Sequence, residues 1–188
     1  MKKLNTKGFT LIELLAVITI MGILMMVAIP TVSRTIENSR KDTFLDTAKS
    51  YVNGAKNMWA ADNLKCGDYL SSAVANGTYY IQIDTTSNSV PVLLEQGGKS
   101  SWGSRDIKGY IRVVVSETGT QKTRVVTYYP VLSDGIHGVN VKNDGSAALA
   151  VGDQVARDKL VRGNLVMSGV AYGNVAFPGV TANTCLEV

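Results

Sequence analysis

The segment that decides the organisation of this chain is KGFTLIELLAVITIMGILMMVAIP, residues 7–30. Within it, residues 9–29 form an apolar run of 21 residues that carries a single charge, Glu13. As a helix, this run would be about 31 Å long, which matches the thickness of the hydrocarbon core of a bilayer. The apolar stretch of a secretory signal peptide is shorter, roughly 7–15 residues. The length of the run therefore predicts a membrane-spanning helix.

The positive charges near the N-terminus lie on one side of this run. Lys2, Lys3 and Lys7 precede it, and no Lys or Arg lies within it. A solubilising tail would also explain three lysines, but their place beside a membrane segment indicates a cytoplasmic N-terminus with the rest of the chain outside. The chain has a net charge of +4, and its remainder has no basic stripe with interleaved aromatic residues. No specific nucleic-acid partner is therefore predicted.

Two features distinguish the run from an ordinary anchor. Glu13 lies only four residues into it, and a carboxylate in hydrocarbon costs several kcal/mol unless it finds a partner. The junction Lys7-Gly8-Phe9 is a plausible peptidase site, and a cut after Gly8 would leave a free amine on Phe9, on the same helix face as Glu13. The alternative is that Glu13 lies near the lipid headgroups and is ionised in water.

Residues 7–15, KGFTLIELL, resemble the prepilin signature of type IV pilins and of the related pseudopilins, which carry a class III signal peptide. The resemblance covers about the first thirty to forty residues. It implies that a prepilin peptidase cuts after Gly8 and methylates the amine of Phe9. It also implies that Glu13 attracts the N-terminal amine of a neighbouring subunit during assembly by the inner-membrane pilus machinery.

The helix continues past the apolar run but is interrupted. Gly22 and Pro30 are predicted helix breakers, because Gly weakens a helix by about 1 kcal/mol and Pro removes a backbone donor. A kink or local melting is expected there, and the resemblance implies a loss of helicity between the two residues in filaments. Up to about residue 62, apolar residues then recur at spacings of three and four, which predicts an amphipathic helix: Val32, Ile36, Phe44, Ala48, Tyr51, Val52, Ala55, Met58 and Trp59.

The rest of the chain predicts strands. Candidates are residues 79–83, 90–94, 107–116 and 122–132, with a turn at 117–121 that joins the last two into a hairpin, and a further strand pair over 166–180. The fold class is therefore α+β, with a long N-terminal helix whose protruding half is apolar, packed against an antiparallel sheet, as in the pilin fold. We expect a removed leader at 1–8, a membrane and filament-core helix at 9–30, an amphipathic helix at 31–64 and a β-rich head at 65–188.

The chain has two cysteines, Cys66 and Cys185. In the oxidising environment outside the membrane they are expected to bond, which would close a loop of 118 intervening residues; two free thiols are the alternative. Members of the resembling family often tie a C-terminal loop with a disulfide, although over a shorter spacing.

The function that these features predict is structural. The resemblance implies a type IV pilin that leaves the bilayer and polymerises with identical subunits into a cell-surface filament, a fimbrium that serves adhesion, motility or related functions. The alternatives are a pseudopilin of a type II secretion or competence system, and a membrane-anchored binding module that does not polymerise. No enzyme, cofactor or metal is predicted, because no clustered polar site appears and the chain has one histidine, His137.

Overall fold

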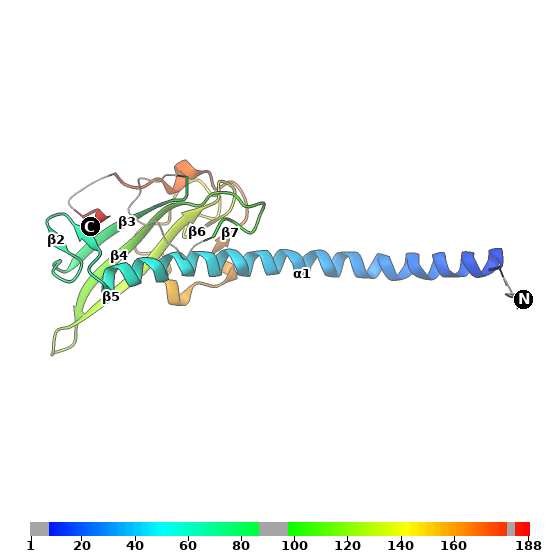
Figure 1. Ribbon diagram of the computed structural model, residues 1–188, viewed down its shortest axis with the longest axis horizontal. Helices are drawn as coiled ribbons and strands as arrows, with labels where there is room; N and C mark the ends of the chain where they lie inside the picture. The colour runs from blue at the N-terminus through cyan, green and yellow to red at the C-terminus, as the bar shows by residue number, and fades with distance from the viewer. Residues whose placement is uncertain (1–7, 87–97, 180–182) are drawn as a thin grey trace, which may run out of the picture. The chain divides into compact units, whose positions relative to one another are not determined.

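The computed structural model describes residues 8–86, 98–179 and 183–188. The chain divides into two compact units, Met1–Ser39 and Arg40–Val188, and the boundary falls inside the first helix. This helix, α1, spans Leu11–Ala60 (Figure 1). The prediction of one helix from residue 9 to about residue 62 is therefore confirmed to within two residues at each end.

The second unit contains the amphipathic part of α1. Its buried face is made of Phe44, Leu45, Ala48, Tyr51, Val52, Gly54, Ala55 and Trp59. Val32 and Ile36, which the spacing assigned to the same face, are 54% and 48% exposed. Burial begins only near Arg40, where the Ser101 hydroxyl donates to the Arg40 carbonyl oxygen at 2.8 Å and the Trp102 ring lies 5.7 Å from that of Phe44.

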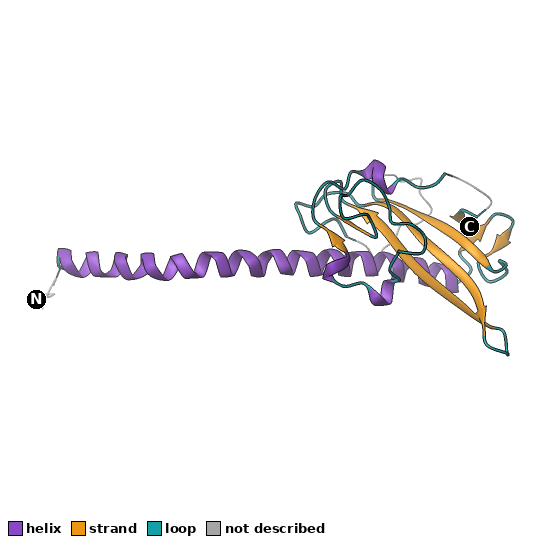
Figure 2. Ribbon diagram, turned by 180° about the vertical axis from the view of Figure 1, so that it is seen from behind, coloured by secondary structure: helices purple, strands orange, loops and turns teal. Residues whose placement is uncertain are grey.

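A five-stranded antiparallel sheet packs against this part of α1 (Figure 2). Its spatial order is β3-β4-β5-β6-β7, and the bounds are Gly77–Asp84, Lys108–Thr118, Thr123–Ser133, Gly138–Val139 and Leu165–Val166. The α+β class, with a long helix on an antiparallel sheet, is thereby confirmed.

The strand predictions have mixed outcomes. The strands expected at 79–83, 107–116 and 122–132 correspond to β3, β4 and β5, and the expected turn joins β4 to β5 as a hairpin. The candidate at 90–94 lies outside the described residues. The strand pair expected over 166–180 is wrong for residues 166–179, which contain only the last residue of β7 and the 3-10 turn η3, Tyr172–Val175. Gly169, with φ of +80°, turns the backbone out of the extended conformation there.

Both faces of the sheet are covered. The face toward α1 presents Ile81, Ile111, Val113 and Val115, all nearly fully buried. The other face is covered by the chain after β5, through a second apolar cluster of Tyr110, Val131, Val141, Val166, Val170 and Val175. The 3-10 turns η1, Arg157–Lys159, and η2, Arg162–Asn164, lie beside α1 instead, because Arg157 donates to Asn53 Oδ1 and Arg162 contacts the Asp42 carboxylate.

Gly109 in β4 is required by the backbone. Its φ is +143°, and a Cβ atom would lie 2.0 Å from the carbonyl oxygen of Val131 on the paired strand. Any other residue would force β4 and β5 apart at this position.

The disulfide joins a second, three-stranded sheet at the C-terminal end of α1. Its order is β2-β1-β8, with bounds Tyr69–Leu70, Leu64–Cys66 and Cys185–Glu187. Cys66 and Cys185 are directly opposite in the β1–β8 register and are bonded, so the expected bridge is confirmed and the alternative of free thiols is excluded. The last strand of the chain is thus attached covalently to the first.

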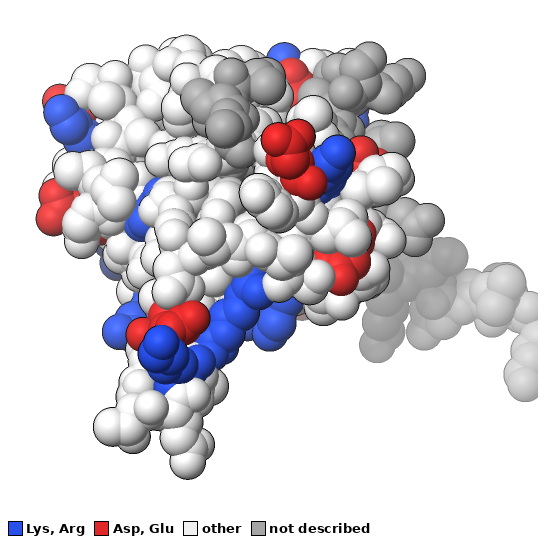
Figure 3. Space-filling view, turned by 90° about the vertical axis from the view of Figure 1, so that its left-hand side faces the viewer, with Lys and Arg blue, Asp and Glu red and all other residues white. Residues whose placement is uncertain are grey.

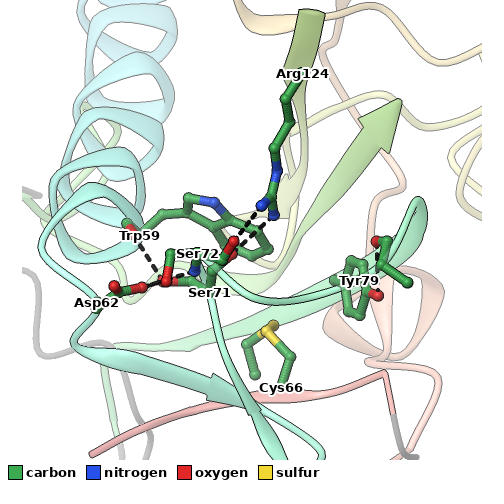
Figure 4. Close-up of a disulfide and its surroundings, with 9 residues drawn as sticks. Trp59, Asp62, Cys66, Ser71, Ser72, Tyr79 and Arg124 are labelled. Carbon is green, nitrogen blue, oxygen red and sulfur yellow. Dashed lines mark hydrogen bonds between the residues drawn. A yellow bond between two sulfur atoms is a disulfide. The ribbon is translucent and has the colours of Figure 1, made fainter. Parts of the chain in front are cut away.

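The end of α1 is closed by hydrogen bonds beside this disulfide (Figure 4). Asp62 has a left-handed φ of +56°, and its N–H and that of Asn63 donate to the carbonyls of Trp59 and Met58, which is a Schellman cap. The Asp62 carboxylate accepts from the N–H of Ser72 at 2.7 Å and the hydroxyl of Ser71 at 2.9 Å. These bonds hold the pKa of Asp62 below its usual value.

Candidate functional site

The predicted processing site is fully accessible. Phe9 is 90% exposed, and Gly8 is also exposed and precedes the helix. A Cβ atom built on Gly8 would meet nothing within 4 Å. The fold of this chain therefore does not require a glycine at position 8. If glycine is required there, the reason is a molecule that binds the junction.

The first turn of α1 is closed by Thr10 and Glu13. The Thr10 backbone N–H and its hydroxyl both donate to Glu13 Oε2 at 2.8 Å, and the Glu13 N–H donates to Thr10 Oγ1 at 3.3 Å. With Thr10 as N-cap and Glu13 at the third helical position, this is a capping box, which satisfies two helix donors reciprocally. Glu13 is thus held in one orientation by its own chain.

The capping box leaves part of the Glu13 carboxylate unused. All its hydrogen bonds from described residues go to Oε2, and none goes to Oε1. A carboxylate has about four acceptor sites, so Oε1 can accept from a further donor without breaking the box. The site can therefore bind a cation that approaches the first turn from outside this chain.

The rest of the first unit exposes an apolar helix surface. Among the described residues, α1 is the one helix long and apolar enough to cross a membrane, and its most apolar window, with a mean hydropathy of 2.6, has no buried residue. The exposed large side chains from 9 to 29 are Phe9, Leu11, Ile12, Leu14, Leu15, Val17, Ile18, Ile20, Met21, Ile23, Leu24, Met25, Met26, Val27 and Ile29. An apolar surface of this extent requires cover by lipid or protein.

α1 remains helical through both predicted breakers. Pro30 lies inside the helix, and Gly22 is followed by regular helix. Of the two expected effects, local melting between Gly22 and Pro30 is wrong for this chain on its own, whereas a kink stays a prediction. Proline removes only one helix donor, and the next residue adds a bond, because the Thr31 hydroxyl donates to the Val27 carbonyl oxygen at 3.2 Å. Loss of helicity inside a filament stays a prediction.

The structure brings together only part of the predicted site. Gly8 and Phe9 lie just before α1 and Glu13 lies in its first turn, where it is bonded to Thr10. The sequence analysis missed Thr10, although the pattern Thr-x-x-Glu before an apolar run is a recognisable capping signal. Cys66 and Cys185 form a separate structural site in the second unit. The described residues contain no group of three or more His, Cys, Asp or Glu that could hold a metal ion.

Comparison with known proteins shows two similarities. A family profile described as the prokaryotic N-terminal methylation motif matches residues 3–29. The fimbrial protein EcpC of Eikenella corrodens is 29% identical over 115 residues, which cover 58% of this chain and 73% of that protein. No solved structure matches the chain. The profile spans the Gly8–Phe9 junction and Glu13, and the similarity to the fimbrial protein is longer than the motif.

Proposed function

We propose that this chain, a type IV pilin with a class III signal peptide at its N-terminus, is a structural subunit that polymerises through α1 into a cell-surface filament. Residues 1–8 are the leader that a prepilin peptidase removes. Residues 9–30 form the membrane and filament-core helix, residues 31–64 the amphipathic helix and residues 65–188 the head. The leader stays in the cytoplasm, and the head lies on the outer side of the membrane before assembly.

The observation that supports this function best is the unused oxygen of Glu13 at the start of an exposed apolar helix. Cleavage after Gly8 gives Phe9 an amine that stays largely protonated at neutral pH, and methylation keeps its positive charge. An ammonium and a carboxylate are each costly in an apolar bundle unless they pair. The amine of an incoming subunit can bind Oε1 of Glu13 on a subunit already in place, which rewards one register between neighbouring helices.

Two environments cover the same apolar surface in turn. Lipid covers residues 9–29 before assembly, and the equivalent helices of sister subunits cover them afterwards. The partners of the chain are therefore the bilayer, the prepilin peptidase, the inner-membrane assembly machinery and further copies of the chain. The chain has a structural role, since the chemistry at Gly8 and Phe9 is performed on it.

Two measurements test the proposal. Mass spectrometry of the mature chain is expected to find an N-terminus at Phe9 that carries one methyl group. Glu13→Gln is expected to abolish sheared filaments while the processed subunit stays in the membrane fraction. Glu37→Gln is the matched control, because Glu37 lies in the same exposed unit of α1 but outside the apolar run. Normal filament yield from the Glu13 variant, or an N-terminus at Met1, would contradict the proposal.

A further inference from the structure

We propose that, in the filament, the tip of the β4–β5 hairpin of one subunit docks into a groove on the head of the next subunit. The tip consists of residues 117–124. The groove lies between α1, at Asp42, Leu45, Asp46 and Lys49, and residues 160–162. This inference rests on the proposed function, because it supplies a contact between heads in addition to the contact between α1 helices.

The hairpin tip extends beyond the sheet that supports it. β3 begins at Gly77, opposite Val115, and β6 pairs only with Leu132 and Ser133. Residues 116–125 therefore form a ribbon of two strands, neither edge of which pairs with a third strand among the residues that the structure describes, and residues 117–125 are exposed. An isolated two-stranded ribbon is marginally stable, and open strand edges favour contact with another chain.

Arg124 braces the ribbon at its base. Its guanidinium donates to the carbonyl oxygens of Ser71 and Ser72, which lie next to the disulfide (Figure 4). The tip is therefore presented in a fixed direction, which lowers the entropy that docking would cost.

The groove has an apolar floor and a charged rim. Its volume is about 430 Å³, and Leu45 and Leu160 in the floor are almost completely buried. On the rim, the carboxylate of Asp42 is occupied by a two-pronged contact with the Arg162 guanidinium. Asp46 and Lys49 have no ion-pair partner among the described residues. One anion and one cation on the rim are thus available to another molecule.

The charges of the tip complement those of the groove. Lys122 on the tip has no ion-pair partner among the residues that the structure describes, and Glu117 lies across the ribbon from Arg124. Lys122 suits Asp46, and Glu117 suits Lys49. Between Glu117 and Lys122 the tip carries only small or polar residues, which allows it to enter the groove: Thr118, Gly119, Thr120 and Gln121. Figure 3 shows basic side chains above the projecting hairpin, with an acidic side chain among them.

The two surfaces lie at opposite ends of the head. Figures 1 and 2 both place the tip beyond the C-terminal end of α1, on the same side of the helix as η1 and η2. Asp46 and Ala60 are separated by roughly 21 Å along the helix axis at 1.5 Å per residue. A contact between different surfaces at opposite ends of a subunit repeats without closing, and therefore generates a filament rather than a dimer.

Cysteine cross-linking in filaments tests the contact. The pair Thr120→Cys and Val161→Cys places one thiol on the tip and one on the groove. The matched control is Thr120→Cys with Val151→Cys, because Val151 and Val161 are 57% and 60% exposed, but Val151 lies in the loop bound to Arg112 on the other face of the sheet. Mild oxidation of sheared filaments is expected to give a ladder of covalent oligomers with the first pair only. No ladder, or equal ladders with both pairs, would overturn the inference.

Charge exchange gives a second, independent readout in the otherwise native chain. Lys122→Asp and Asp46→Lys are each expected to lower the yield of sheared filaments several-fold, and their combination is expected to restore it. Two additive losses would overturn the inference. The two proposals fail differently, because a native chain that forms no extracellular filament contradicts the proposed function, whereas filaments without the cross-link contradict only the docking contact.

Discussion

Thr10 connects the local structure of α1 to its proposed assembly. Its hydroxyl donates to Glu13 Oε2 and accepts from the Glu13 N–H. The same hydroxyl therefore both orients the carboxylate and closes the first turn of α1. Because a carboxylate in hydrocarbon carries a high free-energy cost, the sequence predicted a binding partner for Glu13, and the resemblance placed that partner in another chain. The partner within the chain was visible in the same sequence three residues earlier.

Removal of the Thr10 hydroxyl is expected to loosen this turn. Thr10→Val keeps the shape of the side chain but deletes the cap, which costs about 1 kcal/mol. In detergent micelles, hydrogen exchange of the Glu13 amide should become several-fold faster, and the yield of filaments should fall. Thr10→Ser, which keeps the hydroxyl, should restore both quantities. Equal exchange in the Val and Ser variants would contradict the role of the cap.

Asp134 is a second residue whose partners determine a measurable property. Its carboxylate is fully buried and accepts from the Ser100 hydroxyl and from the N–H groups of Ile136 and His137, and Oδ2 lies 3.0 Å from His137 Nδ1. Burial opposes ionisation, but the hydrogen bonds outweigh it and hold the pKa of Asp134 below its usual value.

This lowered pKa predicts acid sensitivity. The unfolded chain binds the proton of Asp134 more readily than the folded chain, so the stabilisation is complete above the unfolded pKa of about 3.9 and is lost as the pH falls through the folded pKa. Thermal unfolding of the solubilised chain should show Tm falling below about pH 4. Asp134→Asn should lower Tm at pH 7 and should reduce the fall of Tm below about pH 4. Asp153→Asn, on an exposed loop, should change neither quantity.

At the scale of elements, the sheet depends on the chain that covers its outer face. Arg112 in β4 is 3% exposed. Its Nε donates to Gln154 Oε1 at 2.7 Å, its Nη2 donates to the Val151 carbonyl oxygen at 3.0 Å, and its guanidinium lies 4.0 Å from the centre of the Tyr129 ring. Burial lowers the pKa of Arg112, but the group remains charged. Arg112 thus attaches the 149–156 loop to the sheet.

Loss of this attachment is expected to destabilise the head. Arg112→Ala removes two charge-assisted hydrogen bonds and a cation–π contact, which together contribute about 3 kcal/mol. Arg112→Lys should recover little of this, because an ammonium cannot reproduce the planar fork. Urea unfolding measures both, with Arg105→Ala at an exposed position as the control. A Lys variant as stable as the native chain would contradict the assignment.

The elements that sequence reasoning found are those with a regular period. The 3.6-residue pattern of α1 and the alternation in β4 gave the correct element types, and the turn residues gave the hairpin. The chain from Val139 to Phe177, which covers the outer face of the sheet and also reaches α1, has no such period, because tight turns interrupt it and single residues such as Val170 and Val175 carry its burial. The extent of head contact along α1 was also beyond prediction, since it depends on where the loop around Trp102 reaches the helix.

At the scale of the whole molecule, the disulfide determines how the second unit unfolds. Cys66 and Cys185 close a loop that contains the whole five-stranded sheet. Chain-entropy arithmetic for a loop of this length gives about 4–5 kcal/mol, an upper figure because strain reduces it.

Replacement of both cysteines is expected to lower the free energy of unfolding by up to about 4 kcal/mol. Cys66→Ser with Cys185→Ser should therefore unfold at lower urea than the native chain, and a reductant should have the same effect on the native chain but none on the variant. Equal urea midpoints for the variant and the oxidised native chain would show that the loop closure does not contribute.

The bond between β1 and β8 also decides what happens when the ends of the molecule are pulled. A force applied between the N-terminal helix and Val188 crosses from Cys185 directly to Cys66, so the intervening chain carries no load. Reduction would add those residues to the stretched length, which is roughly 400 Å at full extension. While the bond is intact, a load applied between these two points thus leaves the five-stranded sheet mechanically shielded.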